Sequence, residues 1–221
     1  PTLTGDLSGD MLFIILANTG TTITPWQIFF QQSAVVDKGM DVHDIRYGKV
    51  DTFVGALTTC VVAAFIIIAT AGVFHYHPGG QIVVESAAQT AEKMPEVMPA
   101  GTNWGQWAKV LFAIGLFDAG LLGALCISLA TSWALGEVFG WAHSLNKGVH
   151  EAPWFYVAYV LMLLSAGVVS LISSIDIQNI ITIFVQVVAV TLLPAALFFL
   201  ILLLNDKPLM GEHVNTRWQN F

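Results

Sequence analysis

A polar run, Asn18–Pro25, lies in the middle of the first long apolar segment of the sequence, Met11–Ala34. Pro25 has no amide hydrogen to donate, and in a helix its ring crowds the carbonyl of the residue four positions earlier, Thr21. Transporters bind cations at broken helices whose freed carbonyls lie near the centre of the bilayer. The run therefore predicts a helix that is discontinuous at mid-membrane, with the Thr21 carbonyl as a cation ligand.

The alternative interpretation of this run is a proline kink in which the threonine hydroxyls bond back to their own helix. Two observations favour a site. Six of the eight residues in the run are polar or glycine, which is more than a kink requires. Polar residues also continue past the proline, where a helix facing lipid would be apolar. Asn18 before the break and Gln27 after it are therefore candidate residues of an ion pathway.

Two further polar residues fall within later apolar segments of the chain. Asp118 is surrounded by glycines, and an ionisable side chain inside a membrane indicates a pathway or an ion site. The alternative for Asp118 is an acid near the membrane surface that is hydrated or paired with Lys109. Gln186 precedes Pro194 in the last apolar segment. The simpler interpretation is a proline kink, and the alternative is that the Gln186 side chain faces the pathway. Both Asp118 and Gln186 are pathway candidates.

Glu137 lies within a Gly136-x-x-x-Gly140 pattern near the end of the third apolar segment. Small residues at this spacing are typical of helices that pack closely in membranes. We therefore interpret the pattern as a helix-packing motif, with Glu137 reaching towards the membrane surface.

The sequence argues against several other kinds of site. All six histidines lie outside the apolar segments, whereas a membrane cytochrome needs haem-ligating histidines within its helices. Both cysteines lie inside apolar segments and have no metal-ligand spacing. The sequence contains no catalytic motif and no pattern for a resident cofactor, so an enzyme is not expected. The net charge of −7 also argues against binding to nucleic acid, which requires a basic surface.

Composition and hydropathy predict an all-α integral membrane protein. Hydrophobic residues make up 56% of the chain and charged residues only 10%, which is too few for the surface of a soluble domain. The apolar stretches are continuous over roughly 20 residues, as in membrane helices, and lack the alternation of barrel strands. Five spans are predicted, at 11–34, 52–74, 110–140, 153–172 and 180–204, with an outer loop at 75–105 and a cytoplasmic tail at 205–221.

The basic residues predict the orientation of these spans. With the N-terminus outside, six of the eight Lys and Arg residues fall in the inner segments, as the positive-inside rule requires. The C-terminal tail then lies inside and the loop 75–105 lies outside. The chain begins without an initiator methionine or a signal peptide, and we expect it to be part of a longer protein.

The broken segment resembles a known transporter helix. The stretch GTTITPWQIFFQQS at 20–33, followed by AVVDK, is similar to the sixth transmembrane helix of the NRAMP family of divalent-metal transporters, and most similar to the NRAMP-related magnesium transporters. Other segments occur in the same order as in the family: RYGKVD at 46–51, the third span, and Gln186 through LLP at 192–194. The resemblance therefore covers helices six to ten of the family. It implies the second five-helix repeat of a LeuT-type inverted-repeat fold, with a missing N-terminal repeat that supplies the rest of the ion site.

The chain departs from the family pattern at several positions. Most members of the family have Ala-x-x-Met-Pro-His where this sequence has Thr21, Thr24, Pro25 and Trp26. The resemblance implies that Thr21 and Thr24 bind the metal, and oxygen in place of thioether sulfur favours Mg²⁺ over softer ions. Trp26 cannot titrate where the family histidine is linked to proton transfer, which implies transport without proton coupling. Leu192 stands where the family has a glutamine, so the resemblance implies that another polar contact to the metal is lost.

We therefore expect a transporter that carries Mg²⁺ as a partly hydrated ion, by alternating access around the break. Trp26 joins Asn18, Gln27, Asp118 and Gln186 as a pathway candidate. The alternative within the family is a broader transporter of Mn²⁺, other divalent ions or trivalent ions. The alternative from another class is a membrane scaffold that does not transport. The expected location is a prokaryotic cytoplasmic membrane.

Overall fold

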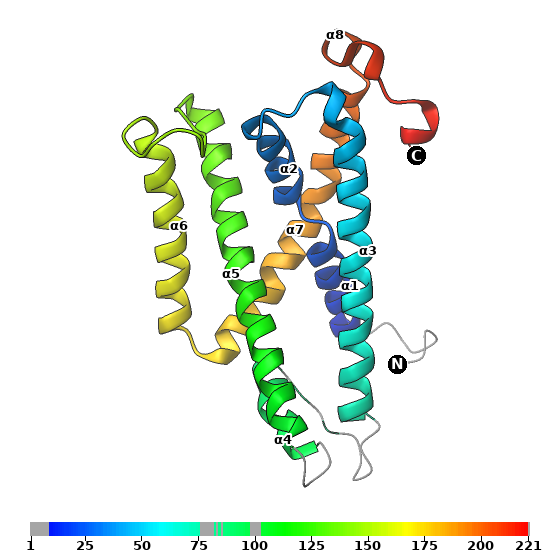
Figure 1. Ribbon diagram of the computed structural model, residues 1–221, viewed down its shortest axis with the longest axis vertical. Coiled ribbons are helices and arrows are strands. Elements are labelled where there is room, and N and C mark those ends of the chain that lie inside the picture. Colours follow the sequence, from blue (N-terminus) through cyan, green and yellow to red (C-terminus); the bar gives the residue numbers. More distant parts are fainter. Residues whose placement is uncertain (1–8, 76–81, 83, 85, 98–102, 221) are drawn as a thin grey trace. The chain divides into compact units, whose positions relative to one another are not determined.

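The computed structural model describes residues 9–75, 82, 84, 86–97 and 103–220. Regular structure in these residues is helical, without strands, so the prediction of an all-α chain is confirmed (Figure 1). Four short helical turns, η1 to η4, accompany eight α-helices. The elements are α1 (Gly9–Thr22), α2 (Pro25–Asp37), η1 (Val42–Asp44), α3 (Ile45–Thr70), η2 (Ala71–His75), α4 (Ala87–Val97), α5 (Trp104–Phe139), α6 (Pro153–Ile172), α7 (Ile175–Leu204), α8 (Lys207–Met210), η3 (Gly211–His213) and η4 (Arg217–Asn220).

Four helical segments among the described residues are long and apolar enough to cross a membrane. Their large apolar side chains are mostly exposed, as expected of helices whose solvent is lipid. The predicted span 11–34 is instead divided between α1 and α2, each of which is shorter than the roughly 20 residues that a bilayer requires. The four segments are Val42–His75, Trp104–Phe139, Pro153–Ile172 and Asp176–Leu204.

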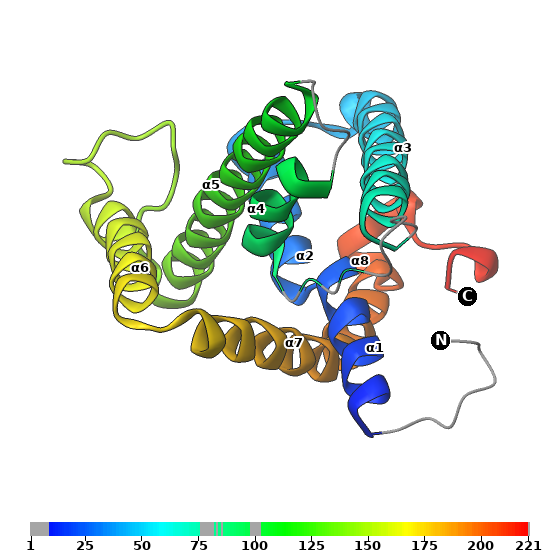
Figure 2. The same ribbon diagram turned by 90° about the horizontal axis from the view of Figure 1, so that it is seen from below.

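The chain forms two compact units, and the boundaries between them fall inside α2 and inside α5. Unit 1 comprises Pro1–Ala34 and Ile127–Phe221, and unit 2 comprises Val35–Cys126. In unit 1, α1 packs against α7, and the two helices cross at an angle (Figure 2). A small aromatic core of unit 1 lies between α5 and α6, where Trp133, Ala152 and Phe155 are almost fully buried.

Unit 2 has its own small core, built around the end of its longest helix. The π-helical turn η2 follows α3 and contacts α4, and the buried ring of Phe74 lies in this turn. Thr90, Ala91 and Met94 form the buried face of α4. The carbonyl of Phe74 accepts a hydrogen bond of 2.9 Å from the amide of Ile82. The predicted outer loop 75–105 thus contains a helix, and its remaining residues lie partly outside the described part of the chain.

Several helices are longer than the hydropathy pattern predicts. The span predicted at 52–74 begins at Ile45, because a capping box between Asp41 and Asp44 starts the helical turn η1 that leads into α3. The span predicted at 180–204 begins at Ile175, since the hydroxyl of Ser174 caps α7 by accepting a bond from the amide of Ile177. The tail 205–221 is partly helical, and the side chain amides of Asn205 and Asn220 donate to each other.

In the described part of the chain, the Gly136-x-x-x-Gly140 pattern ends a helix, which differs from the helix-packing motif that we predicted. Gly140 has a φ of 68° directly after α5, and the amide of Trp141 donates to the carbonyl of Gly136 at 2.8 Å. This is the bonding of a Schellman cap, for which glycine is the preferred residue. A Cβ on Gly136 would lie 2.6 Å from Cγ of His143, so this glycine makes room for the side chain that follows the cap.

Candidate cation site at the helix break

The first predicted span is discontinuous in the structure. Its helix α1 ends at Thr22, α2 begins at Pro25, and only Ile23 and Thr24 between them are non-helical (Figure 1). The break is therefore shorter than the polar run that predicted it, because Asn18–Thr22 remain helical. A continuous helix through this run was the observation that would have favoured the scaffold interpretation, and the chain does not have one.

The threonines of α1 behave as the kink interpretation predicts. Their hydroxyls donate to the carbonyls four residues earlier, over 2.8–3.0 Å, and their side chains are exposed. Such a bond satisfies the hydroxyl within its own helix. The hydroxyl hydrogens are therefore used within α1, while each oxygen keeps lone pairs that can accept. The bonds run from Thr19 to Ile15, from Thr21 to Ala17 and from Thr22 to Asn18.

Thr24 differs from the other threonines, because its hydroxyl is buried and has no partner. The side chain is 4% exposed, and Oγ1 makes no hydrogen bond. Thr24 occupies the N-cap position of α2, where a threonine hydroxyl ordinarily accepts a bond from a helix amide. Here the Gln27 amide donates to the Thr24 carbonyl at 3.1 Å, and the Gln27 side-chain Oε1 accepts from the Thr24 amide at 3.2 Å. The Thr24 hydroxyl takes part in neither bond, so it is left available at the break.

The carbonyl of Thr21 also lacks its ordinary helical donors. Pro25 has no amide hydrogen, so the bond from the residue four positions later does not exist. The amide three positions later, that of Thr24, is directed at the side chain of Gln27. The Thr21 carbonyl is therefore a group that this residue can offer to a cation, besides the exposed oxygen of its hydroxyl, whose hydrogen is bonded to the Ala17 carbonyl.

Gln186 lies where α7 touches α1. A Cβ on Gly20 would overlap the backbone carbonyl oxygen of Gln186, and would lie 2.9 Å from its carbonyl carbon and 3.3 Å from Cβ of Val190. The side-chain Oε1 of Gln186 is buried and makes no hydrogen bond. Close approach of the two helices therefore depends on the missing side chain of Gly20, and it leaves a second buried oxygen without a partner.

Few buried polar side-chain atoms of the described residues lack a hydrogen-bond partner. One of them lies at the break, and another lies on α7, which packs against α1. Among the described residues, the buried side-chain atoms without a partner are Thr24 Oγ1, Gln186 Oε1 and Trp133 Nε1. Buried polar groups in native proteins are nearly always bonded, and an exception requires an explanation such as an unseen ion or water. The two oxygens are acceptors that a cation would satisfy.

The other pathway candidates have different surroundings. Trp26 is half-buried, and its ring meets that of Phe30 edge-on with centroids 6.2 Å apart. Asn18 is exposed, and its carbonyl accepts the bond from Thr22. Asp118 belongs to unit 2, where its side chain is exposed and forms no ion pair with Lys109 or any other described residue of that unit.

A charged metal cluster does not occur among the described residues. They contain no group of three or more His, Cys, Asp or Glu side chains that could hold a metal ion. The oxygens at the break are neutral hydroxyl, carbonyl and amide groups. Neutral oxygens suit hard ions, but divalent ions in proteins usually also receive one or two carboxylates. The arrangement at the break can therefore supply part of a coordination shell.

A family model described as Natural resistance-associated macrophage protein-like, Nramp, matches residues 1–221. The chain belongs to the Nramp family. Nramp proteins transport divalent metal ions across membranes. The family and the four membrane-capable helices of the described residues therefore identify an integral membrane transporter. The family is one of transporters and not of enzymes. A search of curated proteins finds no match.

The sequence did not predict several contacts that shape the helix break and its surroundings. Gly20 was read as part of the polar run, although a glycine in an apolar helix is a general signal of close helix contact. Gln27 remains a predicted pathway residue; its side chain is exposed, and its Oε1 accepts a hydrogen bond from the Thr24 amide. The bond from the buried Ser33 hydroxyl to Glu137 at 3.2 Å joins α2 to α5 and had no sequence signal.

Proposed function

We propose that the helix break binds the transported ion, and that this ion is Mg²⁺ with part of its hydration shell. The observation that carries the proposal is the buried, unpartnered hydroxyl of Thr24 at the start of α2. The Thr21 carbonyl and the Gln186 side-chain oxygen are the other groups that we assign to the ion or to its bound water. Passage of the ion by alternating access then requires the surroundings of the break to open towards one side of the membrane at a time.

The chemistry of the break supports magnesium over softer metals. From Asn18 to Ser33 the sequence contains no sulfur atom and no imidazole, the ligands that favour transition metals. Mg²⁺ prefers hard oxygen ligands and gives up water reluctantly. A site with a few neutral oxygens therefore suits an ion that arrives with water attached. A broader transporter of Mn²⁺ or trivalent cations is the alternative that the experiment below separates.

The remaining ligands, including at least one carboxylate, are assigned to a preceding five-helix repeat of the same protein. The neutral oxygens at the break cannot balance the charge of a divalent ion, and a pair of inverted repeats around a shared midplane site would place the missing charge opposite them. In this arrangement the N-terminus lies outside, the C-terminus lies inside, and the membrane is the cytoplasmic membrane of a prokaryote.

Replacing Thr24 with methionine tests whether its side chain faces the ion. The full-length protein is reconstituted into vesicles, and uptake of Mg²⁺, Mn²⁺ and Cd²⁺ is measured with fluorescent indicators. Thr24→Met exchanges a hard oxygen for a thioether, so we expect Mg²⁺ uptake to fall about tenfold and Cd²⁺ or Mn²⁺ uptake to rise. The matched control is Thr22→Met, because that hydroxyl is exposed and bonded to its own helix.

Two outcomes would contradict the proposal. If the wild-type protein takes up Mn²⁺ without competition from Mg²⁺, the ion assignment is wrong and the broader transporter is favoured. If Thr24→Met and Thr22→Met have the same selectivity as the wild type, Thr24 does not face the ion.

A further inference from the structure

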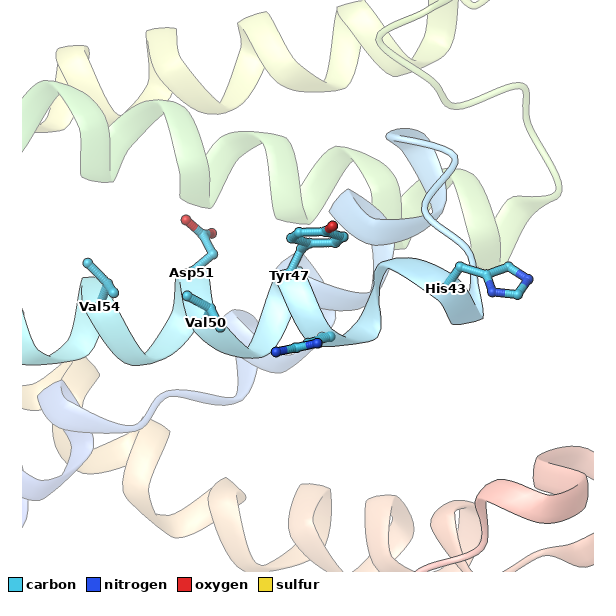
Figure 3. A pocket seen from close by; sticks show the side chains of 6 residues that line it. His43, Tyr47, Val50, Asp51 and Val54 are labelled. Carbon is cyan, nitrogen blue, oxygen red and sulfur yellow. The ribbon is translucent and has the colours of Figure 1, made fainter.

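A groove along α3 in unit 2 has no feature that identifies an occupant (Figure 3). Among the described residues of unit 2, its lining comes only from α3 and the turn η1 before it, so one exposed helix face forms it. The lining residues are His43, Arg46, Tyr47, Val50, Asp51 and Val54. The helix break in unit 1 differs from this groove, because specific hydrogen bonds determine which of its polar atoms are available.

The Thr24 amide is the backbone donor at the break whose partner is a side chain. The amide of Ile23 before it donates to the Thr19 carbonyl at 3.3 Å, as in a continuing helix. Pro25 after it has no amide hydrogen. The Thr24 amide donates to Oε1 of Gln27 at 3.2 Å. The direction of this N–H group therefore depends on the Gln27 side chain.

The carbonyl end of α1 offers the competing acceptors for this amide. An α-helical bond from the Thr24 amide would reach the Gly20 carbonyl, and a 3₁₀ bond would reach the Thr21 carbonyl. Neither bond forms among these described residues. Either one would extend α1 into the break and place a partially positive hydrogen at the C-terminal carbonyls, which are the negative end of the helix dipole. A carbonyl keeps a second lone pair, so the bond would not exclude a cation, but its hydrogen would repel one.

We propose that Gln27 is a positioning residue, whose side chain holds the Thr24 amide away from α1 and thereby keeps the carbonyl end of α1 available to the ion. This role requires no contact between Gln27 and the ion. The inference rests on the proposed ion site at the break, and it applies to any cation that this site carries.

The sequence of the break supports this role. Thr24-Pro25-Trp26-Gln27 has the spacing of a capping box, in which the side chains at both ends accept from backbone amides. Only the bond to the Gln27 side chain is formed, and the Thr24 hydroxyl accepts from no amide. The half-formed box stabilises the start of α2 while it leaves the Thr24 hydroxyl and the carbonyls of α1 without donors.

The test measures initial rates of Mg²⁺ uptake against Mg²⁺ concentration, with the full-length protein in vesicles at physiological ionic strength. Gln27→Leu removes the acceptor at similar side-chain size. We expect its KM to rise roughly three- to tenfold, with a smaller change in maximal rate, because the released amide competes with the ion for one hydrogen bond. Gln27→Glu retains an acceptor for the same amide, so its KM should stay within about twofold of wild type, since its exposed charge is screened by salt.

Gln31→Leu is the matched control, because Gln31 is an exposed glutamine one turn further along α2. Its KM should equal that of the wild type. The proposal is overturned if Gln27→Leu keeps the wild-type KM, if Gln27→Glu raises KM as Gln27→Leu does, or if Gln31→Leu has the same effect as Gln27→Leu. A fall in KM of more than about tenfold in Gln27→Glu also overturns it, because a carboxylate with that effect would contact the ion itself.

Thr24→Met, measured in the same vesicles, separates this inference from the proposed ion site. Wild-type ion selectivity in Thr24→Met contradicts the ion site. Altered selectivity in Thr24→Met, together with a wild-type KM in Gln27→Leu, contradicts only the role of Gln27. Elution volume and helical content establish that each variant is folded. Gln27→Ala also lacks the acceptor, and the same rise in KM is expected of it if Gln27→Leu does not fold.

Discussion

Thr24 holds the N-cap position of α2 while its hydroxyl does not act as the cap. Leaving a buried hydroxyl without a partner costs about 1–3 kcal/mol, and a bond to the helix amides would remove that cost. The helix amide of Gln27 donates to the Thr24 carbonyl instead, and the Gln27 side chain accepts from the Thr24 amide. The local structure thus maintains an unsatisfied oxygen at the break, as expected of a group whose partner is a transported ion.

Gly20 controls the approach of α1 to α7, and its replacement is the sharpest test of that contact. In Gly20→Ala the new methyl group would meet the backbone carbonyl of Gln186, which cannot move aside as a flexible side chain would. We expect a loss of roughly 1–3 kcal/mol, as in other overpacked sites. Thermal unfolding of the full-length protein in detergent measures this loss as a lower midpoint.

The control for Gly20 is Gly167→Ala in α6, where an added methyl group would meet nothing within 4 Å. Alanine is the better helix former by about 1 kcal/mol, so this variant should keep the wild-type midpoint or exceed it. Equal midpoints for the two variants would show that α1 and α7 are not in close contact in the folded protein.

Residue types predicted the break but not its detailed geometry. Pro25 and the polar run marked the position, because a proline must free a carbonyl wherever it interrupts a helix. The Thr21 hydroxyl donates to a carbonyl of its own helix, whereas the Thr24 hydroxyl has no partner, because the Gln27 amide donates to the Thr24 carbonyl. Such competition between equivalent local bonds cannot be resolved from sequence.

At the scale of elements, the two halves of the broken span contact different partners. α1 packs against α7, whereas α2 contacts α5 and α6 through side chains. Phe30 of α2 lies 5.7 Å, centroid to centroid, from Trp133 of α5, which in turn lies 6.4 Å from Phe155 of α6. The non-helical pair Ile23–Thr24 therefore connects two helices that are held by different partners.

The bond from Ser33 to Glu137 should contribute to holding α2 on α5. Ser33→Ala removes the donor, and we expect a loss of about 1 kcal/mol, because the serine is buried while the acid is largely exposed. Thermal unfolding of Ser33→Ala, Glu137→Ala and the double variant measures the coupling between the two side chains. Losses that simply add would contradict a direct bond. Gln32→Ala, at an exposed neighbouring position, is the control.

Hydropathy located the spans but not the ends of their helices. The polar segment at the start of α3 is helical although it is not apolar, because caps and local bonds decide where a helix begins. Asp41 and Ser174 provide such caps. The same reasoning applies to Gly136-x-x-x-Gly140, which ends a helix where we predicted a packing motif. A glycine spacing alone does not distinguish close helix contact from a C-terminal cap that requires a positive φ.

At the scale of the whole molecule, the central parts of α1, α2 and α7 carry no group that could move a proton. From Met11 to Val36, and from Ile177 to Leu204, the sequence has no titratable side chain. Transport of a divalent ion through such surroundings moves two uncompensated charges. The membrane potential contributes about 2.3 kcal/mol per charge for each 100 mV, so it is expected to supply the driving force.

Vesicles that contain the full-length protein test this expectation with potassium diffusion potentials. A potential of −100 mV inside should drive Mg²⁺ accumulation by roughly three powers of ten at equilibrium, since about 4.6 kcal/mol acts on the two charges. A pH gradient at zero potential should have no effect, and a dye inside the vesicles should report no acidification. Trp26→His, which places a titratable ring beside the break, should make uptake dependent on pH. Acidification that accompanies Mg²⁺ uptake by the wild type would show that protons travel with the ion, through groups outside these helices.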